Sequence, residues 1–444
     1  MKKIISTLAL ATLAFGSVFA DVTFTTNYRT RMAAFSRVMN ADKWTTSDPF
    51  DPTVIDNAMK DRFNSYLFAQ RGYDSASDDF KIEVANDFGG AGVRIDPSLG
   101  DNQDTSDDRN ALAEYYGYVN LGAIKITAGL IDGISNGTYR LTDEVGASNL
   151  CGESTDAYAP GSMHGAAISF KADDITYFDG ESRPVGMITY TGDFGDTVLT
   201  ADLVAAAIDN NNGSATWDGS EMHAALGARV DLKIPAADIQ FVFKQHTNTS
   251  AVSKRSVALH VAPAISENLS LALGGAAGFY NGDLSEFNAD IRFMFKSGNM
   301  SITSLNTIGF VTDNGVNNGT SVGYDTHVGL VFVDSTGASV SQDNRASQSS
   351  MWNLLAFRME VSEKLAVFCN VGDIIGFNAA HKEIGDYGME FFLAPGFQFY
   401  ATKNCSITSA LRVGVSNLLM DDETYKDIEP AYGILVPVVL RVQL

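Results

Sequence analysis

The sequence contains little cysteine and, after its first twenty residues, no long apolar run. Its three cysteines, Cys151, Cys369 and Cys405, are widely spaced. They exclude a disulfide framework as the organising principle, although one pair can form in an oxidising compartment; packing is the expected role of Cys369 and Cys405. The longest late apolar run, residues 434–440, contains Pro437. No stretch approaches the roughly 18 apolar residues that a spanning helix requires.

Catalytic signatures are also missing. Neither a phosphate-binding Gly-x-x-x-x-Gly-Lys nor a zinc-binding His-Glu-x-x-His occurs. Ser162 and His164 share a face of an extended segment, but nothing else indicates a serine hydrolase. The histidines are scattered without ligand spacing, so surface or loop positions are expected for them: His164, His223, His246, His260, His327 and His381. We therefore expect no enzyme and no cofactor.

Basic residues are outnumbered. The chain has 31 Lys and Arg against 53 Asp and Glu, for a formal net charge of -22. This balance argues against nucleic acid and anionic membrane surfaces as partners, and favours either attraction of cations or acidic loops that keep the protein soluble. An acidic cluster of Asp101, Asp104, Asp107 and Asp108 is a weak candidate for a divalent cation such as calcium. It lacks the calcium-loop spacing and glycine, so a solvated loop is favoured.

Residues 1–20 have the form of a bacterial secretory signal peptide. Lys2 and Lys3 precede an apolar run, and small residues before Asp21 suit cleavage. Export leaves the periplasm, the exterior or the outer membrane as destinations. If the mature chain spans a membrane, it does so with strands, because only helices and closed barrels satisfy their backbone polar groups in hydrocarbon.

A two-residue alternation runs through residues 21–444. Polar and charged residues keep to one phase and bulky apolar residues to the other, as in residues 22–32, 228–233, 288–295 and 357–361. Alternate strand side chains point to opposite faces, so the pattern predicts sheets with one polar and one apolar face. The polar phase is rich in Gly, Ser, Thr, Asn and isolated Arg. The apolar phase often ends in aromatic residues, for example Phe293, Phe295, Phe399 and Tyr400. Aromatic girdles at two membrane interfaces would explain that enrichment, with core aromatics as the alternative.

Connections between the predicted strands differ in length at the two ends of the sheet. Tight turns are predicted within residues 192–196, 235–238, 265–270, 296–301, 361–366 and 401–406. Longer polar connections are predicted at residues 41–60, 96–110, 133–161, 209–220, 312–321, 342–350 and 417–429. We therefore predict an all-β fold: a transmembrane antiparallel up-and-down β-barrel of about 18 strands (16 to 22), with short periplasmic turns and long outer loops. Residues 174–179 and 338–341 are doubtful strands.

Residues 62–132 resemble the early strands of the Gram-negative general diffusion porins. The segment 114–122, Glu-Tyr-Tyr-Gly-Tyr-Val-Asn-Leu-Gly, is similar to a family strand that runs into a tight turn, and residues 124–129 are similar to the return strand. Leu130 stands where the family has Arg. The final strand, residues 432–444, resembles the C-terminal assembly signal of outer-membrane proteins, with Leu444 in place of the usual aromatic and Pro437 within the strand.

The resemblance implies that residues 133–161 occupy the place of the porin constriction loop; an extracellular excursion over the rim is the alternative. The charged residues of this segment are Arg140, Asp143, Glu144, Glu153 and Asp156. In the family, acidic loop residues face basic residues of the wall, and Arg29, Arg31 and Arg62 match that wall by phase. Three barrels side by side, a homotrimer, is a further implication of the resemblance.

The predicted function is an outer-membrane porin, a water-filled channel for passive diffusion of small hydrophilic solutes and ions. The residues predicted to line the pore share one phase: Arg29, Arg31, Arg62, Lys125, Arg229, Arg292, Arg358, Arg412 and Arg441. Two alternatives remain open. One is an outer-membrane barrel that serves as an adhesin or receptor through its loops, and the other is a secreted soluble β-rich binding protein or enzyme.

Overall fold

The computed structural model describes residues 21–39, 63–69, 79–95, 112–131, 183–207, 224–248, 253–312, 324–325, 346–347, 349–377, 389–418 and 431–443. The predicted signal peptide, the doubtful strands at 174–179 and 338–341, and the long connections at 41–60, 96–110, 133–161 and 209–220 lie outside these residues. Within the described ranges, no helix is long and apolar enough to cross a membrane.

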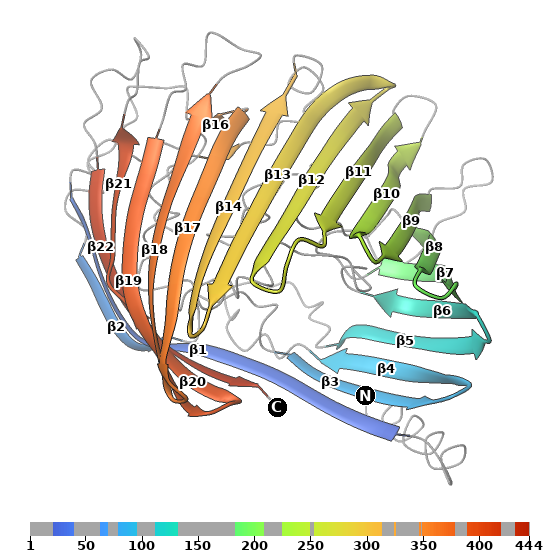
Figure 1. Ribbon diagram of the computed structural model, residues 1–444, viewed down its shortest axis with the longest axis horizontal. Helices are drawn as coiled ribbons and strands as arrows, with labels where there is room; N and C mark the ends of the chain where they lie inside the picture. The colour runs from blue at the N-terminus through green and yellow to red at the C-terminus, as the bar shows by residue number, and fades with distance from the viewer. Residues whose placement is uncertain are drawn as a thin grey trace, which may run out of the picture.

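The described residues form β-strands joined by turns (Figure 1). The strands of the first half are β1 (Asp21–Met39), β2 (Phe63–Ala69), β3 (Asp79–Asn86), β4 (Gly89–Ile95), β5 (Leu112–Leu121), β6 (Ile124–Ile131), β7 (Arg183–Asp193), β8 (Val198–Ala207), β9 (Ala224–Ile234) and β10 (Ala237–Asn248). Those of the second half are β11 (Ser253–Pro263), β12 (Leu269–Tyr280), β13 (Asp283–Ser297), β14 (Met300–Val311), β15 (Tyr324–Asp325), β16 (Ala346–Ser347), β17 (Ser349–Ser362), β18 (Leu365–Phe377), β19 (Met389–Thr402), β20 (Cys405–Ala410), β21 (Arg412–Leu418) and β22 (Ala431–Gln443).

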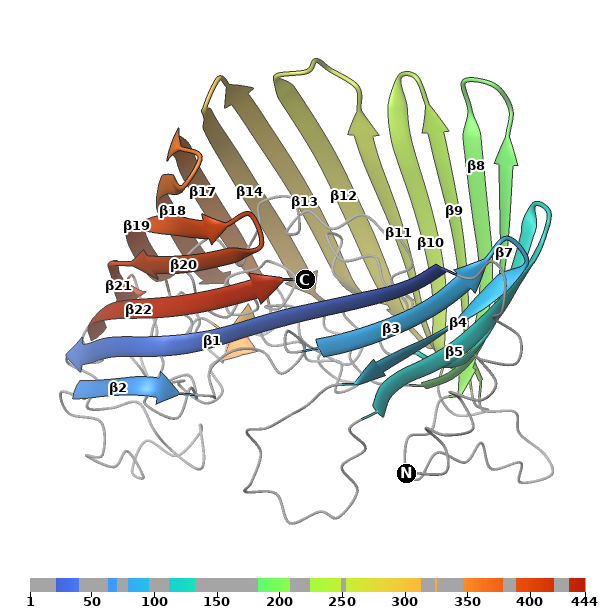
Figure 2. The same ribbon diagram turned by 90° about the horizontal axis from the view of Figure 1, so that it is seen from below.

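All described strands except β15 and β16 pair in one antiparallel sheet of 20 strands. Successive strands are neighbours, and β1 pairs with β22 on one side and with β2 and β3 on the other, so the sheet closes on itself. Figure 2 shows β1 between β22 and β3. Two positions of the ring are each filled by two short strands. β2 and β3 both pair with β1, and β20 and β21 both pair with β22, so the 20 strands occupy 18 positions. The predicted antiparallel barrel of about 18 strands is confirmed.

Connection lengths alternate as predicted. At one end, the strands join through residues 87–88, 122–123, 194–197, 235–236, 264–268, 298–299, 363–364 and 403–404. At the other end the connections are longer, apart from residues 249–252 and 281–282. The second of these turns was not predicted from the sequence. Asn281 and Gly282 have φ of 52° and 94°, as the Asn-Gly hairpin turn requires, because both of its central residues are left-handed. The predicted connections at 342–350 and 417–429 were partly wrong, because Ser349, Ser350, Asn417 and Leu418 belong to strands.

The two faces of the sheet differ as the alternation predicts. On β6, Ile126 is 44% exposed and the next residue, Thr127, is 4% exposed. On β8, Leu203 is exposed and Asp202 is buried. The exposed apolar phase faces outward, and the buried phase faces the interior of the barrel. Large apolar residues that are exposed outnumber the buried ones among the described residues, the reverse of a water-soluble protein.

The interior is less uniformly polar than expected. Leu354, Phe368 and Phe392 are almost fully buried on the inner phase of β17, β18 and β19. The expectation for Tyr400 was also wrong, because this residue lies on the inner phase of β19 and not among the outward aromatics. In this part of the sheet both phases carry large side chains, so alternation alone cannot assign the faces. Cys369 and Cys405 are half-buried and occupy the outward phase of β18 and β20.

Candidate functional site: the polar inner wall

One group of interacting residues lies on the inner face of β3, β5 and β6. The Lys81 ammonium lies 5.4 Å from the centroid of the Tyr116 ring and 3.8 Å from Glu83 Oε2. The Tyr116 hydroxyl donates a hydrogen bond of 3.3 Å to the same Glu83 oxygen. Next to it, the Lys125 ammonium lies 4.0 Å from the centroid of the Tyr118 ring. Cations are attracted to the faces of aromatic rings, so the two tyrosines hold the two lysines against the wall.

The same two tyrosines lie over glycines on the neighbouring strand. Gly92 and Gly90 are the direct partners of Tyr116 and Tyr118 in the β4–β5 register. A Cβ added at Gly92 would lie 2.5 Å from the Tyr116 ring, and one at Gly90 would lie 2.7 Å from that of Tyr118. Only glycine leaves space for a ring there. The rings therefore lie along the wall and do not project toward the barrel axis.

The arrangement recurs elsewhere on the sheet, between β18 and β19. Gly372 pairs with Phe392 and Gly396 pairs with Phe368. A Cβ on either glycine would collide with the partner's ring. Aromatic residues that cover glycines in this way help to fix the register of neighbouring strands. At both places a large ring takes up little of the cross-section of the barrel.

A buried ion-pair group crosses β8 and β9. Arg229 Nη2 lies 2.6 Å from Asp202 Oδ2, and Arg229 Nε lies 3.2 Å from Asp231 Oδ2. The Arg229 side chain is 3% exposed and that of Asp202 is 0% exposed. The β8–β9 register places Asp202 directly opposite Arg229. Burial on this scale is tolerated because the opposite charges compensate one another.

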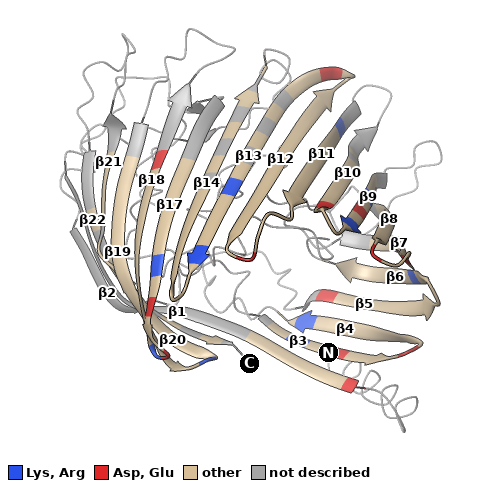
Figure 3. Cartoon of the chain, in the orientation of Figure 1, with Lys and Arg blue, Asp and Glu red and all other residues tan. Residues whose placement is uncertain are grey.

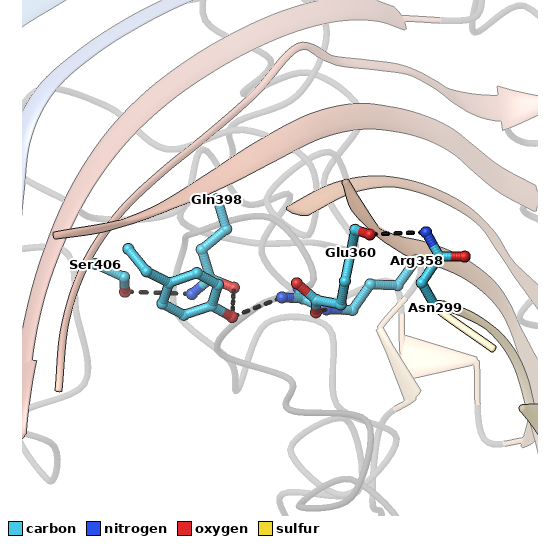
Figure 4. Close-up of polar contacts among 6 residues, drawn as sticks. Asn299, Arg358, Glu360, Gln398 and Ser406 are labelled. Atoms are coloured by element: carbon cyan, nitrogen blue, oxygen red, sulfur yellow. Dashed lines mark hydrogen bonds and ion pairs between the residues drawn. The ribbon is translucent and has the colours of Figure 1, made fainter. Parts of the chain in front are cut away.

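A hydrogen-bonded chain connects β17, β19 and β20 near the short-turn end (Figure 4). Arg358 Nη2 donates to the Tyr400 hydroxyl at 2.6 Å, and this hydroxyl donates to Gln398 Oε1 at 2.8 Å. Gln398 Nε2 in turn donates to Ser406 Oγ at 3.2 Å. On its other side, Arg358 Nε donates to Glu360 Oε1 at 2.7 Å. The guanidinium is thereby fixed against the wall by neighbours on two strands.

Between these groups, Arg292 and His260 lie on the inner phase of β13 and β11. The Arg292 side chain is almost completely buried and Nη2 donates to Ser270 Oγ at 3.3 Å. His260 is 1% exposed. The surface or loop position expected for this histidine was therefore wrong: the two-residue alternation places it on the inner side of a strand. No group of three or more His, Cys, Asp or Glu side chains suitable for a metal ion occurs in the described part of the chain.

Four residues of the predicted pore-lining set have described side chains: Lys125, Arg229, Arg292 and Arg358. All four occupy the inner phase of their strands. Figure 3 shows that charged positions are sparse along the described strands. They are spread around the ring from β6 to β17 and do not meet at one point. Most of their partners were not predicted from the sequence, because a partner on a neighbouring strand depends on the register of the two strands.

The remaining predictions are described only in part or not at all. Arg29, Arg31, Arg412 and Arg441 occupy strand positions on β1, β21 and β22, and their side chains lie outside the description. The register pairs Arg29 directly with Arg441. The other predicted residues lie outside the described ranges: Arg62, Arg140, Asp143, Glu144, Glu153, Asp156, Asp101, Asp104, Asp107 and Asp108.

Comparison with known proteins gives structural matches only. No protein-family model matches the chain, and no curated protein matches its sequence. Among solved structures, the chain is similar to an anion-selective porin from Comamonas acidovorans, at 10% identity and a TM-score of 0.43, with 95% of this chain and 100% of that chain covered. It is also similar to OpdL of Pseudomonas aeruginosa, at 8% identity and a TM-score of 0.48, with 96% of this chain and 99% of that chain covered. A third match is a BenF-like porin from Pseudomonas fluorescens Pf-5, at 9% identity and a TM-score of 0.45, with the same coverage of 96% and 99%. These matches cover nearly the whole chain and concern the fold alone.

Proposed function

We propose that the chain is an exported outer-membrane porin, whose barrel forms a water-filled channel for passive diffusion of small hydrophilic solutes and ions. One observation carries the proposal: a closed antiparallel sheet with an exposed apolar outer face and a polar, charged inner wall. A closed barrel satisfies its backbone hydrogen bonds within the sheet, which is a condition for crossing hydrocarbon. Its inner wall is then the surface that solutes meet.

The outer face supports a membrane location. Exposed apolar side chains follow the outward phase around the sheet, from Phe80 and Ile126 through Leu259 to Phe397 and Val413. The largest apolar patch on a typical soluble monomer is roughly 300–600 Å², and a band around a whole barrel is far larger. Contact with lipid removes the cost of exposing this band to water.

The inner wall supports a channel that selects by size and charge. Rings that lie flat over glycines, such as Tyr116 over Gly92, keep the cross-section open. Charged side chains of the wall act most strongly on ions that pass close to them, because the Coulomb interaction grows as the distance falls. The predicted pore-lining set of nine basic residues and the predicted constriction segment 133–161 belong to this proposal.

Planar-bilayer recording tests the function directly. We expect the purified protein to give discrete single-channel steps. An adhesin or receptor with a blocked lumen would fold in micelles, migrate as a heat-modifiable band and never conduct. A soluble secreted protein would remain in the aqueous phase on detergent partitioning.

The β1–β22 register makes a selectivity test possible. Arg29 lies directly opposite Arg441, and two like charges at one level form a cationic spot if both line the lumen. Replacement of both by alanine should shift the zero-current potential in a salt gradient toward cation preference. As a control, Arg255→Ala removes a charge from the outward phase of β11 and should leave the potential unchanged. An unchanged potential in the double variant would refute the lumen placement of this pair.

A further inference from the structure

The Arg358 side chain crosses the inner wall from one strand to the next but one. Arg358 lies on β17, and its Nη2 group donates to the Tyr400 hydroxyl on β19 at 2.6 Å. The strand between them is β18, which pairs with β17 on one side and with β19 on the other. The guanidinium therefore bridges two strands that are separated by a third (Figure 4).

This bridge passes over a small residue. On β18, the direct partner of Arg358 is Phe368. The backbone N–H of Tyr400 donates to the carbonyl oxygen of Lys364, also on the β18 side, at 2.9 Å. The inner position midway between these two levels is Ala366, which is 0% exposed. Because alanine carries only a methyl group, it leaves room for the guanidinium to lie across β18 close to the wall.

Buried residues at the far end of the hydrogen-bonded chain orient the Tyr400 hydroxyl. Gln398 is 3% exposed and Ser406 is 5% exposed, and Gln398 Nε2 donates to Ser406 Oγ at 3.2 Å. With its amide nitrogen engaged in this way, Gln398 presents its oxygen to Tyr400 and accepts the hydroxyl proton at 2.8 Å. A hydroxyl has a single proton to donate, so the lone pairs of Tyr400 face Arg358. A guanidinium only donates hydrogen bonds, and an acceptor is what it requires.

The other side of the guanidinium is held by an exposed ion pair. Arg358 Nε lies 2.7 Å from Glu360 Oε1, and the two side chains are 22% and 47% exposed. This end of the chain therefore reaches the lumen, whereas the Ser406 end is enclosed in the wall. Ion pairs as exposed as this one hold their partners weakly. The bond to Tyr400 is consequently the contact that decides where the guanidinium lies.

We propose that Tyr400 is a positioning residue, whose hydroxyl holds the charge of Arg358 against the wall and thereby sets the charge selectivity at the short-turn mouth of the channel. β17 ends at Ser362, four residues after Arg358, which places the guanidinium near that mouth. Without the hydroxyl, the guanidinium keeps only the exposed pair with Glu360 and extends into the lumen. The inference rests on the proposed function, because charge selectivity is a property of a conducting channel.

Coulomb's law gives the size of the effect. An ion that passes about 4 Å instead of about 8 Å from a unit charge in water has twice the interaction energy, which changes the local ion population about twofold. An Arg358 side chain that extends toward the barrel axis shortens this distance for every passing ion. Anions gain and cations lose, so the anion-to-cation permeability ratio rises.

The zero-current potential of a planar bilayer in a salt gradient tests the proposal. Tyr400→Phe removes only the hydroxyl and leaves every formal charge in place, and it should raise the anion-to-cation permeability ratio about twofold. Arg358→Met should lower the ratio below that of the wild type, and adding Tyr400→Phe to Arg358→Met should change nothing further. An unchanged ratio in Tyr400→Phe overturns the proposal. An equal change in both backgrounds also overturns it, because Tyr400 then acts without Arg358.

A tyrosine on the other face of the sheet supplies the matched control. Tyr190 is 36% exposed on the outward phase of β7. Tyr190→Phe also removes a single hydroxyl, and it is expected to keep the wild-type permeability ratio. A shift in this control as large as that of Tyr400→Phe overturns the proposal, since the loss of any tyrosine hydroxyl then suffices.

Chemical modification locates the guanidinium without a current. Phenylglyoxal reacts with accessible guanidinium groups, and mass spectrometry of the protein from lipid nanodiscs gives the rate at each arginine. Arg358 should react several-fold faster in Tyr400→Phe than in the wild type, whereas Arg255, which is exposed on β11, is a reference whose rate stays constant. If Tyr400→Phe does not fold, Gln398→Met serves in its place, because it removes the acceptor that orients the hydroxyl; the same acceleration is expected.

The two readouts separate this inference from the porin proposal. Equal rates at Arg358 in the wild type and the variant overturn the positioning role, even in a protein that conducts. Faster modification of Arg358 in a protein that never conducts keeps the positioning role of Tyr400 and loses the porin function.

Discussion

The buried charges around Arg229 make a quantitative prediction. Replacement of Arg229 by methionine keeps a long side chain but leaves Asp202 and Asp231 facing one another without their cation. The Asp202 side chain is fully buried and that of Asp231 is 16% exposed. Removal of one partner of a buried ion pair typically costs about 3–5 kcal/mol, because the remaining charge is left uncompensated. We expect the free energy of unfolding to fall by about that amount.

Urea unfolding of the barrel from lipid vesicles, followed by tryptophan fluorescence, gives the comparison. Adding Asp202→Asn and Asp231→Asn to Arg229→Met should restore much of the loss, because no uncompensated charge then remains. Glu360→Gln is a matched control at the more exposed Arg358 pair, whose side chains are 22% and 47% exposed; such pairs contribute about 0–1 kcal/mol. If Arg229→Met costs no more than this control, or if the triple variant is as unstable as the single one, the reasoning is refuted.

Three further predictions concern the wall, a turn and the outer face. Gly92→Val should push the Tyr116 ring into the lumen and lower single-channel conductance, whereas Gly117→Val, whose added Cβ has its nearest neighbour at 3.7 Å, should not; equal conductances would contradict the account. Gly282→Ala should destabilise the β12–β13 turn by about 1 kcal/mol in urea unfolding, because its φ of 94° suits glycine. Leu203→Arg, on the outward phase of β8, should cost about 2–4 kcal/mol in vesicles if it lies near the bilayer midplane; no loss would argue against lipid contact.

The sequence predicted the architecture because each strand carries its own evidence. Alternation and turn composition are local, so the hairpins at residues 296–301 and 401–406 were predicted correctly. The β12–β13 turn was missed although its Asn-Gly pair is a strong local signal. Arg229 and Asp231 were predicted to share one face of the sheet, because they are two residues apart on one strand.

The contacts within the site were not predictable in the same way. Asp202 becomes the partner of Arg229 only through the β8–β9 register, which depends on the length of the connection between the strands. The segment around Leu354 carries apolar residues on both phases, so periodicity could not show which of them face inward. Register and curvature are properties of the closed sheet, and no single strand encodes them.

Labelling of adjacent positions on β6 tests the central claim, that the two faces of the sheet meet different solvents. Ile124 and Ile126 are exposed on the outward phase, and Lys125 lies between them on the inner phase and is not buried. In a background with the three native cysteines replaced by serine, single cysteines are introduced at these three positions. A fluorophore at position 124 or 126 should be quenched by brominated lipid, while Lys125→Cys should escape quenching and react with a small water-soluble thiol reagent. Quenching at all three positions, or no reaction at Lys125→Cys, would contradict a barrel with lipid outside and water within.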